Sequence, residues 1–190
     1  MSASQPKPVL LPIGLAAAGT DSSKSHGLED EVIALFDRHR DRLLRYLLSF
    51  GLPVQDGEEI VQEVFLALFQ HLKRGKSRRN LRGWVFRVGH NLALKRRHRN
   101  AADLAGALYD LGNRFVEPGP NPEDQLAYAE QRRRLLAVLH ALPEQDRRCL
   151  SLRAEGLRYR EIAAVLDMSL GAVSISLGRS LTRLARVNER

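Results

Sequence analysis

The sequence predicts an all-α protein with two small helical domains joined by a flexible linker, the second containing a helix-turn-helix. Apolar residues recur at helical spacing through most of the chain, and a Gly- and Pro-rich stretch interrupts that spacing once. No useful run of alternating apolar and polar residues indicates a strand. We predict a mobile N-terminal tail over 1–25, a helical domain over 26–100, a linker over 101–121 and a helical domain over 122–190.

Three amphipathic patterns predict the first domain. The pattern over 28–50 ends at Gly51 and Pro53, residues that commonly terminate helices. The clearest pattern lies within 60–72, where the apolar residues advance by one and three positions, and a third runs over 81–92. A helical period of 3.6 residues places each set on one face, so the three helices should bury those faces in one bundle.

The second domain follows a segment that cannot be helical. The sequence PGPNP over 118–122 breaks any helix, and a new helical pattern then runs to Pro143. Two shorter patterns in LRYREIAAVLDMSLGAVSISLGRSLTRL, over 157–184, are separated by Asp167, Met168 and Ser169. The Ser169 hydroxyl is expected to cap the later helix. The spacing favours a helix-turn-helix, and an ordinary helical hairpin is the alternative.

Charge is distributed unevenly along the chain. The 190 residues include 30 Lys and Arg against 22 Asp and Glu, a formal net charge of +8. The segment over 64–102 holds eleven of these cations and no acid, so the basicity is local. A solvated face would carry compensating carboxylates. The segment therefore indicates a polyanionic partner, and nucleic acid is favoured over a membrane surface because the chain lacks a lipid-anchor signal.

Cysteine and hydropathy patterns restrict the cellular setting. The single Cys149 excludes an internal disulfide and a multi-cysteine zinc site, which is typical of a reducing compartment, so we expect a cytoplasmic protein. No run of about 18 apolar residues is present, so no stable membrane insertion is expected. The stretch VLLPIGLAAAG over 9–19 has only Lys7 ahead of it and Pro12 within it, so we expect a tail rather than an export signal.

Two segments combine residues suited to binding macromolecules. In QDGEEIVQEVFLALF, over 55–69, four acids crowd the first turns of a helix, where the helix dipole favours carboxylates, and their polar face is also a candidate dock for a basic protein surface. Over 80–100, aromatic and amide side chains interleave with cations, which suits phosphates, base faces and base edges. Trp84 and Phe86 also fit a plain core role there.

A family resemblance joins these motifs. DGEEIVQEVFLALF, GWVFRVGHNLALKRRHR, a Pro-containing linker and LPEQDRRCLSLRAEGLRYREIAAVLDMSLGAVSISLGRSLTRL occur in this order and cover most of 28–187. Together they resemble the extracytoplasmic-function (ECF) group of bacterial RNA polymerase sigma factors. The resemblance implies a transcription initiation factor that associates with core RNA polymerase, directs it to specific promoters and helps melt the DNA. It also implies a DNA-binding protein without a cofactor or an active site.

The resemblance assigns roles to individual positions. The acidic helix is implied to bind the clamp helices of the largest polymerase subunit through Asp56, Glu58, Glu59, Gln62 and Glu63. The loop over 73–80 and the helix after it are implied to melt and read the minus-ten element through Asn80, Trp84, Arg87, His90, Asn91, Lys95 and Arg96. The linker is implied to thread toward the active-site channel of the polymerase.

The second domain is implied to touch the flap of the second-largest subunit and to read the minus-thirty-five element. Its matching positions are Arg158, Tyr159, Ser169, Gly171, Ala172, Ser174, Ser176 and Arg179. An anti-sigma protein is a further candidate partner.

The recognition segment departs from the family pattern at one point. Family members usually carry a basic pair around a serine where this chain has Ser174, Ile175 and Ser176. We therefore expect few cationic contacts to the upstream element, and Ser176→Arg to raise affinity for it. Gly171 should let the backbone approach the DNA, and the Ala172 methyl group suits a thymine.

Two other classes of function compete. A stand-alone helix-turn-helix regulator that binds duplex DNA as a dimer would need neither the acidic helix nor the acid-free segment. An enzyme acting on nucleic acid would need paired carboxylates or a metal cluster. The six histidines are scattered without metal-ligand spacing such as HExxH. We therefore expect no catalytic residue, no metal and no cofactor.

Overall fold

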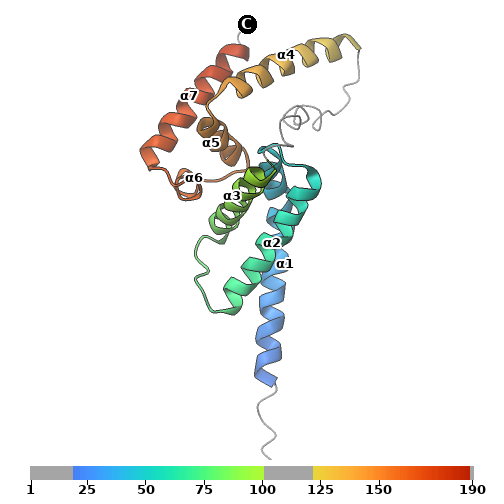
Figure 1. The fold of residues 1–190 in the computed structure, drawn as a ribbon, viewed down its shortest axis with the longest axis vertical. Helices are drawn as coiled ribbons and strands as arrows, with labels where there is room; N and C mark the ends of the chain where they lie inside the picture. The colour runs from blue at the N-terminus through green and yellow to red at the C-terminus, as the bar shows by residue number, and fades with distance from the viewer. Residues whose placement is uncertain (1–18, 101–121, 189–190) are drawn as a thin grey trace, which may run out of the picture.

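The computed structural model describes residues 19–100 and 122–188, which form seven helices and no strand (Figure 1). The first domain comprises α1 (Gly19–Leu48), α2 (Val54–Lys73) and α3 (Leu81–Arg99). The second comprises α4 (Pro122–Ala141), α5 (Glu144–Ala154), α6 (Tyr159–Leu166) and α7 (Leu170–Asn188). The expected all-α class is confirmed. The predicted linker over 101–121 lies outside the described residues.

The start of α1 differs from the expected boundary. The helix begins at Gly19, so residues 19–25, which we expected to be part of the tail, are helical. The rest of the expected tail, 1–18, lies outside the described residues. Figure 1 shows α1 and α2 side by side, with α1 running on past the end of α2. The N-terminal part of α1 therefore projects beyond the three-helix bundle.

The three helices of the first domain bury the apolar faces expected from the sequence. On α2 the buried side chains are Ile60, Val61, Val64, Phe65, Leu68 and Leu72. Two glycines allow close helix crossings: a Cβ on Gly57 would lie 2.8 Å from Leu44 Cδ1, and one on Gly89 would lie 2.8 Å from Leu43 Cδ1. At both distances the leucine would have to move. Glycine therefore brings α2 and α3 close against α1.

Helices α6 and α7 form the expected helix-turn-helix. Their axes bend by 106° at the turn, within the range of roughly 90–120° typical of the motif. Asp167 adopts the left-handed conformation, φ 54°, and ends α6. The Ser169 Oγ accepts a hydrogen bond of 3.1 Å from the backbone N–H of Ala172, which caps α7 as expected. The turn thus sets α7 across the domain as a candidate recognition helix.

The two domains contact each other through ion pairs. The first domain supplies three arginines and the second supplies three glutamates, in the pairs Arg82–Glu161, Arg97–Glu144 and Arg45–Glu155. The hydrogen bond from Arg97, together with one from Arg148, lowers the pKa of Glu144 to about 2, although burial opposes this shift. In addition, the guanidinium of Arg148 lies 4.0 Å from the centre of the Phe50 ring.

Glu161 has two roles at this domain contact. Its carboxylate accepts hydrogen bonds from the guanidinium of Arg82 and, at 2.7 Å, from the backbone N–H of Arg158 at the start of α6. Burial disfavours the ionised form, but these hydrogen bonds outweigh it and lower the pKa of Glu161. One carboxylate therefore caps a helix of the second domain and holds an arginine of the first.

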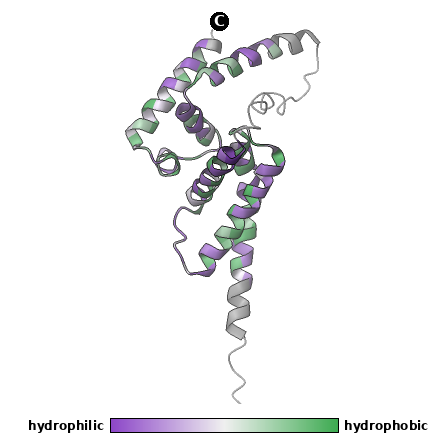
Figure 2. Cartoon of the chain, viewed as in Figure 1, coloured by the Kyte–Doolittle hydropathy of each residue, from purple (hydrophilic) through white to green (hydrophobic). Residues whose placement is uncertain are grey.

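Hydropathy follows the packing of the described residues. The loop between α2 and α3 is hydrophilic along its length (Figure 2).

No single described helix is long and apolar enough to cross a membrane. Helices α6 and α7 meet that criterion only as a pair, and the pair is sharply bent at the turn.

Candidate protein and nucleic-acid interfaces

Helix α3 presents a polar stripe to solvent. Arg87, Asn91 and Lys95 are spaced by four residues and are all exposed. Because a helix turns about 100° per residue, side chains at this spacing lie along one face. The stripe combines two cations suited to phosphates with an amide suited to a base edge. Three of the expected minus-ten residues therefore share one accessible surface.

The acid-free segment does not keep all its positive charge available. Four of its arginines form ion pairs with carboxylates from other parts of the chain, namely Arg78–Glu31, Arg82–Glu161, Arg97–Glu144 and Arg96 with both Asp56 and Glu59. The sequence predicted a local excess of cations, and the fold brings distant acids to part of it. The charge available for a polyanion is therefore smaller than the sequence count.

Arg96 is one residue whose position differs from the expectation. Its guanidinium donates hydrogen bonds of 2.7 Å to Asp56 and 3.0 Å to Glu59, and the side chain is 20% exposed. The hydrogen bond to Glu59 raises the pKa of Arg96. Since both carboxylates lie on α2, Arg96 ties α2 to α3. It is engaged inside the protein and does not extend toward DNA as we expected.

His90 is a second residue whose position differs from the expectation. It is 7% exposed, and its Nδ1 lies 2.7 Å from the hydroxyl oxygen of Tyr46. Burial lowers the pKa of His90 to about 4, so the ring is neutral near pH 7. A buried, neutral ring bonded to Tyr46 presents little surface to a promoter, so the structure gives no support to the DNA contact expected of His90, which stays a prediction.

Two other residues assigned to the minus-ten element have structural partners. Trp84 is half-buried and its ring lies 4.8 Å from that of His71, between centroids. Asn80 caps α3, with φ 54°, and its Oδ1 accepts a hydrogen bond of 3.2 Å from the backbone N–H of Gly83. Both residues remain partly or fully exposed, so their structural roles leave surface for a ligand.

Helix α2 presents an exposed acidic face. Four of the five positions assigned to polymerase binding are exposed: Glu58, Glu59, Gln62 and Glu63. Asp56 is half-buried against α3. Leu66, which the sequence reasoning missed, lies on the same face one turn after Gln62 and is 59% exposed. Leu66 falls outside the helical spacing of the buried residues of α2, and this mismatch was the signal that would have identified it as an exposed residue.

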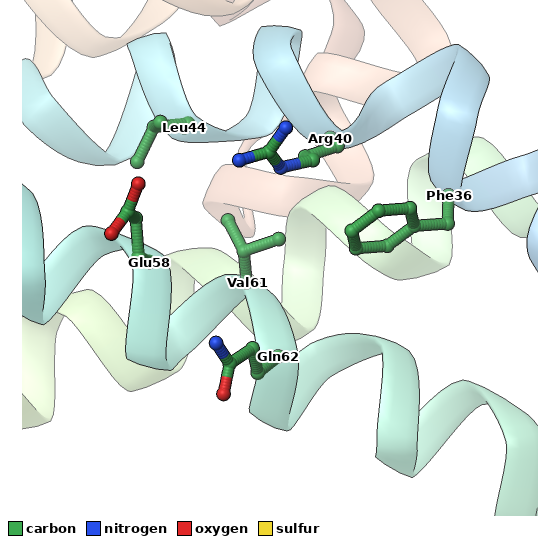
Figure 3. Close-up of a pocket in the computed structure, with 6 residues that line it drawn as sticks. All are labelled: Phe36, Arg40, Leu44, Glu58, Val61 and Gln62. Carbon is green, nitrogen blue, oxygen red and sulfur yellow. The ribbon is translucent and has the colours of Figure 1, made fainter.

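A small pocket of about 210 Å³ opens between α1 and α2 at one edge of this acidic face. Figure 3 shows the six residues that line it, three from each helix: Phe36, Arg40, Leu44, Glu58, Val61 and Gln62. Apolar groups lie beside one cation, one carboxylate and one amide. Such a pocket suits an apolar side chain flanked by polar groups.

The second domain exposes most of the residues assigned to the minus-thirty-five element. Arg158, Ser169, Gly171, Ser174 and Arg179 are exposed, Tyr159 is 38% exposed and Ala172 is partly buried.

Ser176 is the residue of the second domain whose position differs from the expectation. It is 2% exposed, and its hydroxyl donates a hydrogen bond of 2.7 Å to Asp146 Oδ1. This side chain faces α5 and the domain core, so the structure gives no support to the DNA contact expected of Ser176, which stays a prediction.

The described residues contain no cluster of three His, Cys, Asp or Glu side chains arranged to hold a metal ion. Cys149 is a free, buried thiol whose pKa burial raises.

Comparisons with known proteins agree with this architecture. The family model for sigma-70 region 2 matches residues 35–102, and the model for sigma-70 region 4 matches residues 132–184. These matches cover the bundle with the α2 and α3 surfaces and the domain with the helix-turn-helix.

Individual relatives point the same way. RNA polymerase sigma factor CnrH of Cupriavidus metallidurans is 33% identical over 159 residues, which span 80% of this chain and 83% of CnrH. ECF RNA polymerase sigma factor SigE of Mycolicibacterium smegmatis is 30% identical over 151 residues, spanning 79% of this chain and 58% of SigE. A solved structure of CnrH in complex with the cytosolic domain of CnrY matches with a TM-score of 0.57 and 27% identity, covering 88% of this chain and 94% of that one.

The chain therefore belongs to the ECF group of RNA polymerase sigma factors. Sigma factors are DNA-binding transcription initiation factors that direct RNA polymerase to promoters. The family expected from the sequence is confirmed, and the stand-alone regulator is the less supported alternative.

Proposed function

We propose that the exposed face of α2 docks on the clamp helices of the largest polymerase subunit. Glu58, Glu59 and Glu63 supply negative charge, and Leu66 supplies an exposed apolar contact at 59% exposure. The pocket beside Glu58 and Gln62 takes an apolar side chain from the same partner. A charged rim around apolar anchors is the usual composition of a specific protein interface.

The exposed stripe on α3 engages the minus-ten element. Arg87 and Lys95 contact phosphates, and Asn91 between them reads a base. Trp84 offers a partly exposed ring on which an unstacked base can lie during melting. One observation carries the proposed function: two surfaces of opposite charge lie on neighbouring helices. The face on α2 is acidic, the stripe on α3 is cationic and carries an amide, and Arg96 joins the two helices.

The second domain reads the minus-thirty-five element through α7 and touches the flap of the second-largest subunit. The linker over 101–121 is proposed to lead toward the active-site channel. An anti-sigma protein is a further proposed partner, and the CnrH relative solved with the cytosolic domain of CnrY gives a precedent for a bound protein. The site of action is the cytoplasm, where core polymerase meets DNA, and the protein acts without catalysing a reaction itself.

Run-off transcription on genomic fragments tests this function. Core polymerase with the purified chain should initiate at discrete promoters, whereas neither component should do so alone. Permanganate footprinting of thymines in the melted region should report opening only with the holoenzyme. A stand-alone regulator would instead shift promoter duplex in the absence of core polymerase, and that result would overturn the proposal.

A further inference from the structure

The solvent-facing side of α7 is centred on an apolar residue. Ile175 is 65% exposed, whereas Val173, Ser176, Leu177 and Ser180 are buried. Each residue turns the helix by about 100°, so Ile175 points to solvent while the next residue in the sequence already faces the core. The accessible face of the recognition helix therefore includes Ile175 and excludes Ser176, which we expected to contact DNA. Its most prominent side chain has no hydrogen-bonding group.

Two glycines flank Ile175 on the same face. Gly171 lies four residues before it and Gly178 lies three residues after it. A Cβ added at either glycine would meet nothing within 4 Å, so the domain's own packing requires neither. Glycine inside a helix lowers helix stability relative to alanine. Gly178, inside α7, bears this penalty without a packing benefit in the domain, and both glycines leave room for a close approach to the helix backbone.

The charge of α7 identifies the class of ligand. The helix contains no Asp or Glu, and it carries Arg179, Arg183 and Arg186 in its C-terminal half. Because each residue turns the helix by about 100°, Arg179 and Arg186 lie within about 40° of Ile175 and continue its face, while Arg183 lies at the edge of that face. In a helix-turn-helix, the N-terminal residues of the recognition helix reach base edges. The later arginines are then placed for phosphates, so the face matches a duplex major groove.

We propose that Ile175 is a specificity-determining residue that packs against the C5-methyl group of a thymine in the upstream promoter element. The thymine methyl is the characteristic apolar group in the major-groove pattern of bases, and an aliphatic side chain reads it by contact. Gly171 and Gly178 let the helix settle deeply enough for that contact. The inference rests on the proposed promoter-reading function and replaces the cationic reading expected from the family with an apolar one.

The test removes one methyl group from the DNA. Holoenzyme first selects preferred promoters from a library randomised across the upstream element, and each thymine there is then replaced in turn by deoxyuridine, which lacks only the C5-methyl. At one position, wild-type holoenzyme should bind the deoxyuridine promoter about fourfold more weakly, the effect of burying roughly one methyl-sized group. Ile175→Ala should bind the thymine promoter about fourfold more weakly and show no further loss with deoxyuridine.

Two variants control for changes in the helix itself. Leu181 is 52% exposed on α7 but lies off the face centred on Ile175, so Leu181→Ala should keep the full sensitivity to deoxyuridine. Gly178→Ala should raise the thermal midpoint, because alanine favours the helix, while weakening binding to the upstream element. Opposite effects on stability and DNA binding distinguish a docking role from a folding role.

The outcomes separate the inference from the function on which it rests. If the holoenzyme initiates at selected promoters but no deoxyuridine substitution weakens wild-type binding, Ile175 does not read a thymine methyl and only the inference is wrong. If Ile175→Ala remains as sensitive to the substitution as wild type, another residue contacts the methyl. If no upstream sequence is selected at all, the proposed reading of the minus-thirty-five element is also wrong.

Discussion

Ser176 of the recognition helix and Asp146 of α5 form a buried hydrogen bond of 2.7 Å that joins two helices of the second domain. Asp146 is 5% exposed, and its other carboxylate oxygen has no hydrogen-bond partner among the described residues. Arg179 lies 4.0 Å from that second oxygen. The serine hydroxyl is therefore the principal hydrogen-bond donor to a buried carboxylate.

Removing this donor should destabilise the domain. Ser176→Ala leaves Oδ1 of Asp146 buried without a hydrogen bond as well, which should lower the free energy of unfolding by about 1–3 kcal/mol. Ser176→Arg forces a large side chain into a packed position and should cost a similar amount. Urea unfolding followed by circular dichroism measures both. Ser174→Ala, at an exposed position on the same helix, is the matched control and should change stability little. A stable Ser176→Arg variant with tighter DNA binding would restore the expectation from the sequence.

Charge reversal on α2 should separate docking from folding. Glu63→Arg combined with Glu58→Arg should weaken binding to core polymerase by at least about tenfold while leaving the unfolding midpoint unchanged, because both side chains are exposed. Glu59→Arg should weaken binding too, but it also places a cation beside Arg96 and should lower stability. Fluorescence anisotropy with core polymerase measures the first effect. Co-elution of the double variant with core at wild-type affinity would exclude this face as the dock.

The salt dependence of promoter binding should distinguish the cations of α3. Lys95 is exposed, so Lys95→Ala should reduce the slope of log K against log salt by about 0.7–0.9, the value for one phosphate contact. Arg96→Ala should leave the slope unchanged and lower stability, since Arg96 bonds Asp56 and Glu59. Asn91→Ala should relax base preference with little change in slope. Binding titrations of holoenzyme at several salt concentrations decide among these outcomes.

The domain contact should depend on charge pairing. Arg45 donates to both carboxylate oxygens of Glu155, at 3.1 and 2.8 Å. Arg45→Glu should place two carboxylates together and separate the domains, and the exchanged pair Arg45→Glu with Glu155→Arg should restore much of the contact. We expect a coupling energy of about 0.5–1 kcal/mol, because Arg45 remains partly exposed. Energy transfer between dyes on α1 and α7 measures the separation. Equal transfer in all three proteins would mean that this pair does not hold the domains.

The free energy of unfolding should decrease as the pH is lowered, because of the titration of His90. Burial lowers the pKa of His90 in the folded protein to about 4, below its ordinary value of 6.5. The unfolded chain therefore binds the proton more tightly, and stability is lost as pH falls from about 6.5 to 4. His90→Gln should remove up to about 1.4 kcal/mol per pH unit of this slope. Unfolding free energies between pH 7 and 4.5 provide the measurement. An unchanged slope in the variant would show that His90 is not the titrating group.

Helical spacing accounts for most of the fold that the sequence predicted. The stripe over 60–72 and the break around Asp167 specify helix faces and a turn directly, because period and chain reversal are local properties. Arg87, Asn91 and Lys95 also follow from spacing, since their face opposes the buried one. The same spacing also indicates that His90 is buried, because it lies between Phe86 and Ala93 on the buried side of α3.

The differences arise from contacts between distant residues. No local pattern indicates that Arg96 meets Asp56, or that Ser176 meets Asp146 thirty positions away. Small polar residues have weak hydropathy, so nothing in the sequence around Ser176 indicates that it is buried. Its burial depends on the hydrogen bond to Asp146, which only the tertiary structure shows. The ion pairs of the basic segment depend similarly on tertiary packing. Sequence therefore predicted the helices and their exposed faces better than it predicted which polar side chains on those faces are engaged within the protein.

The double use of Glu161 means that its bond to Arg82 and its cap on α6 are made by separate hydrogen bonds. If Arg82 is withdrawn, the carboxylate retains its hydrogen bond to the backbone N–H of Arg158, and α6 keeps its cap. The caps of α6 and α7 therefore come from within the second domain and do not depend on a residue of the first. Separation of the domains would then have to break the contacts between them and would leave these caps in place.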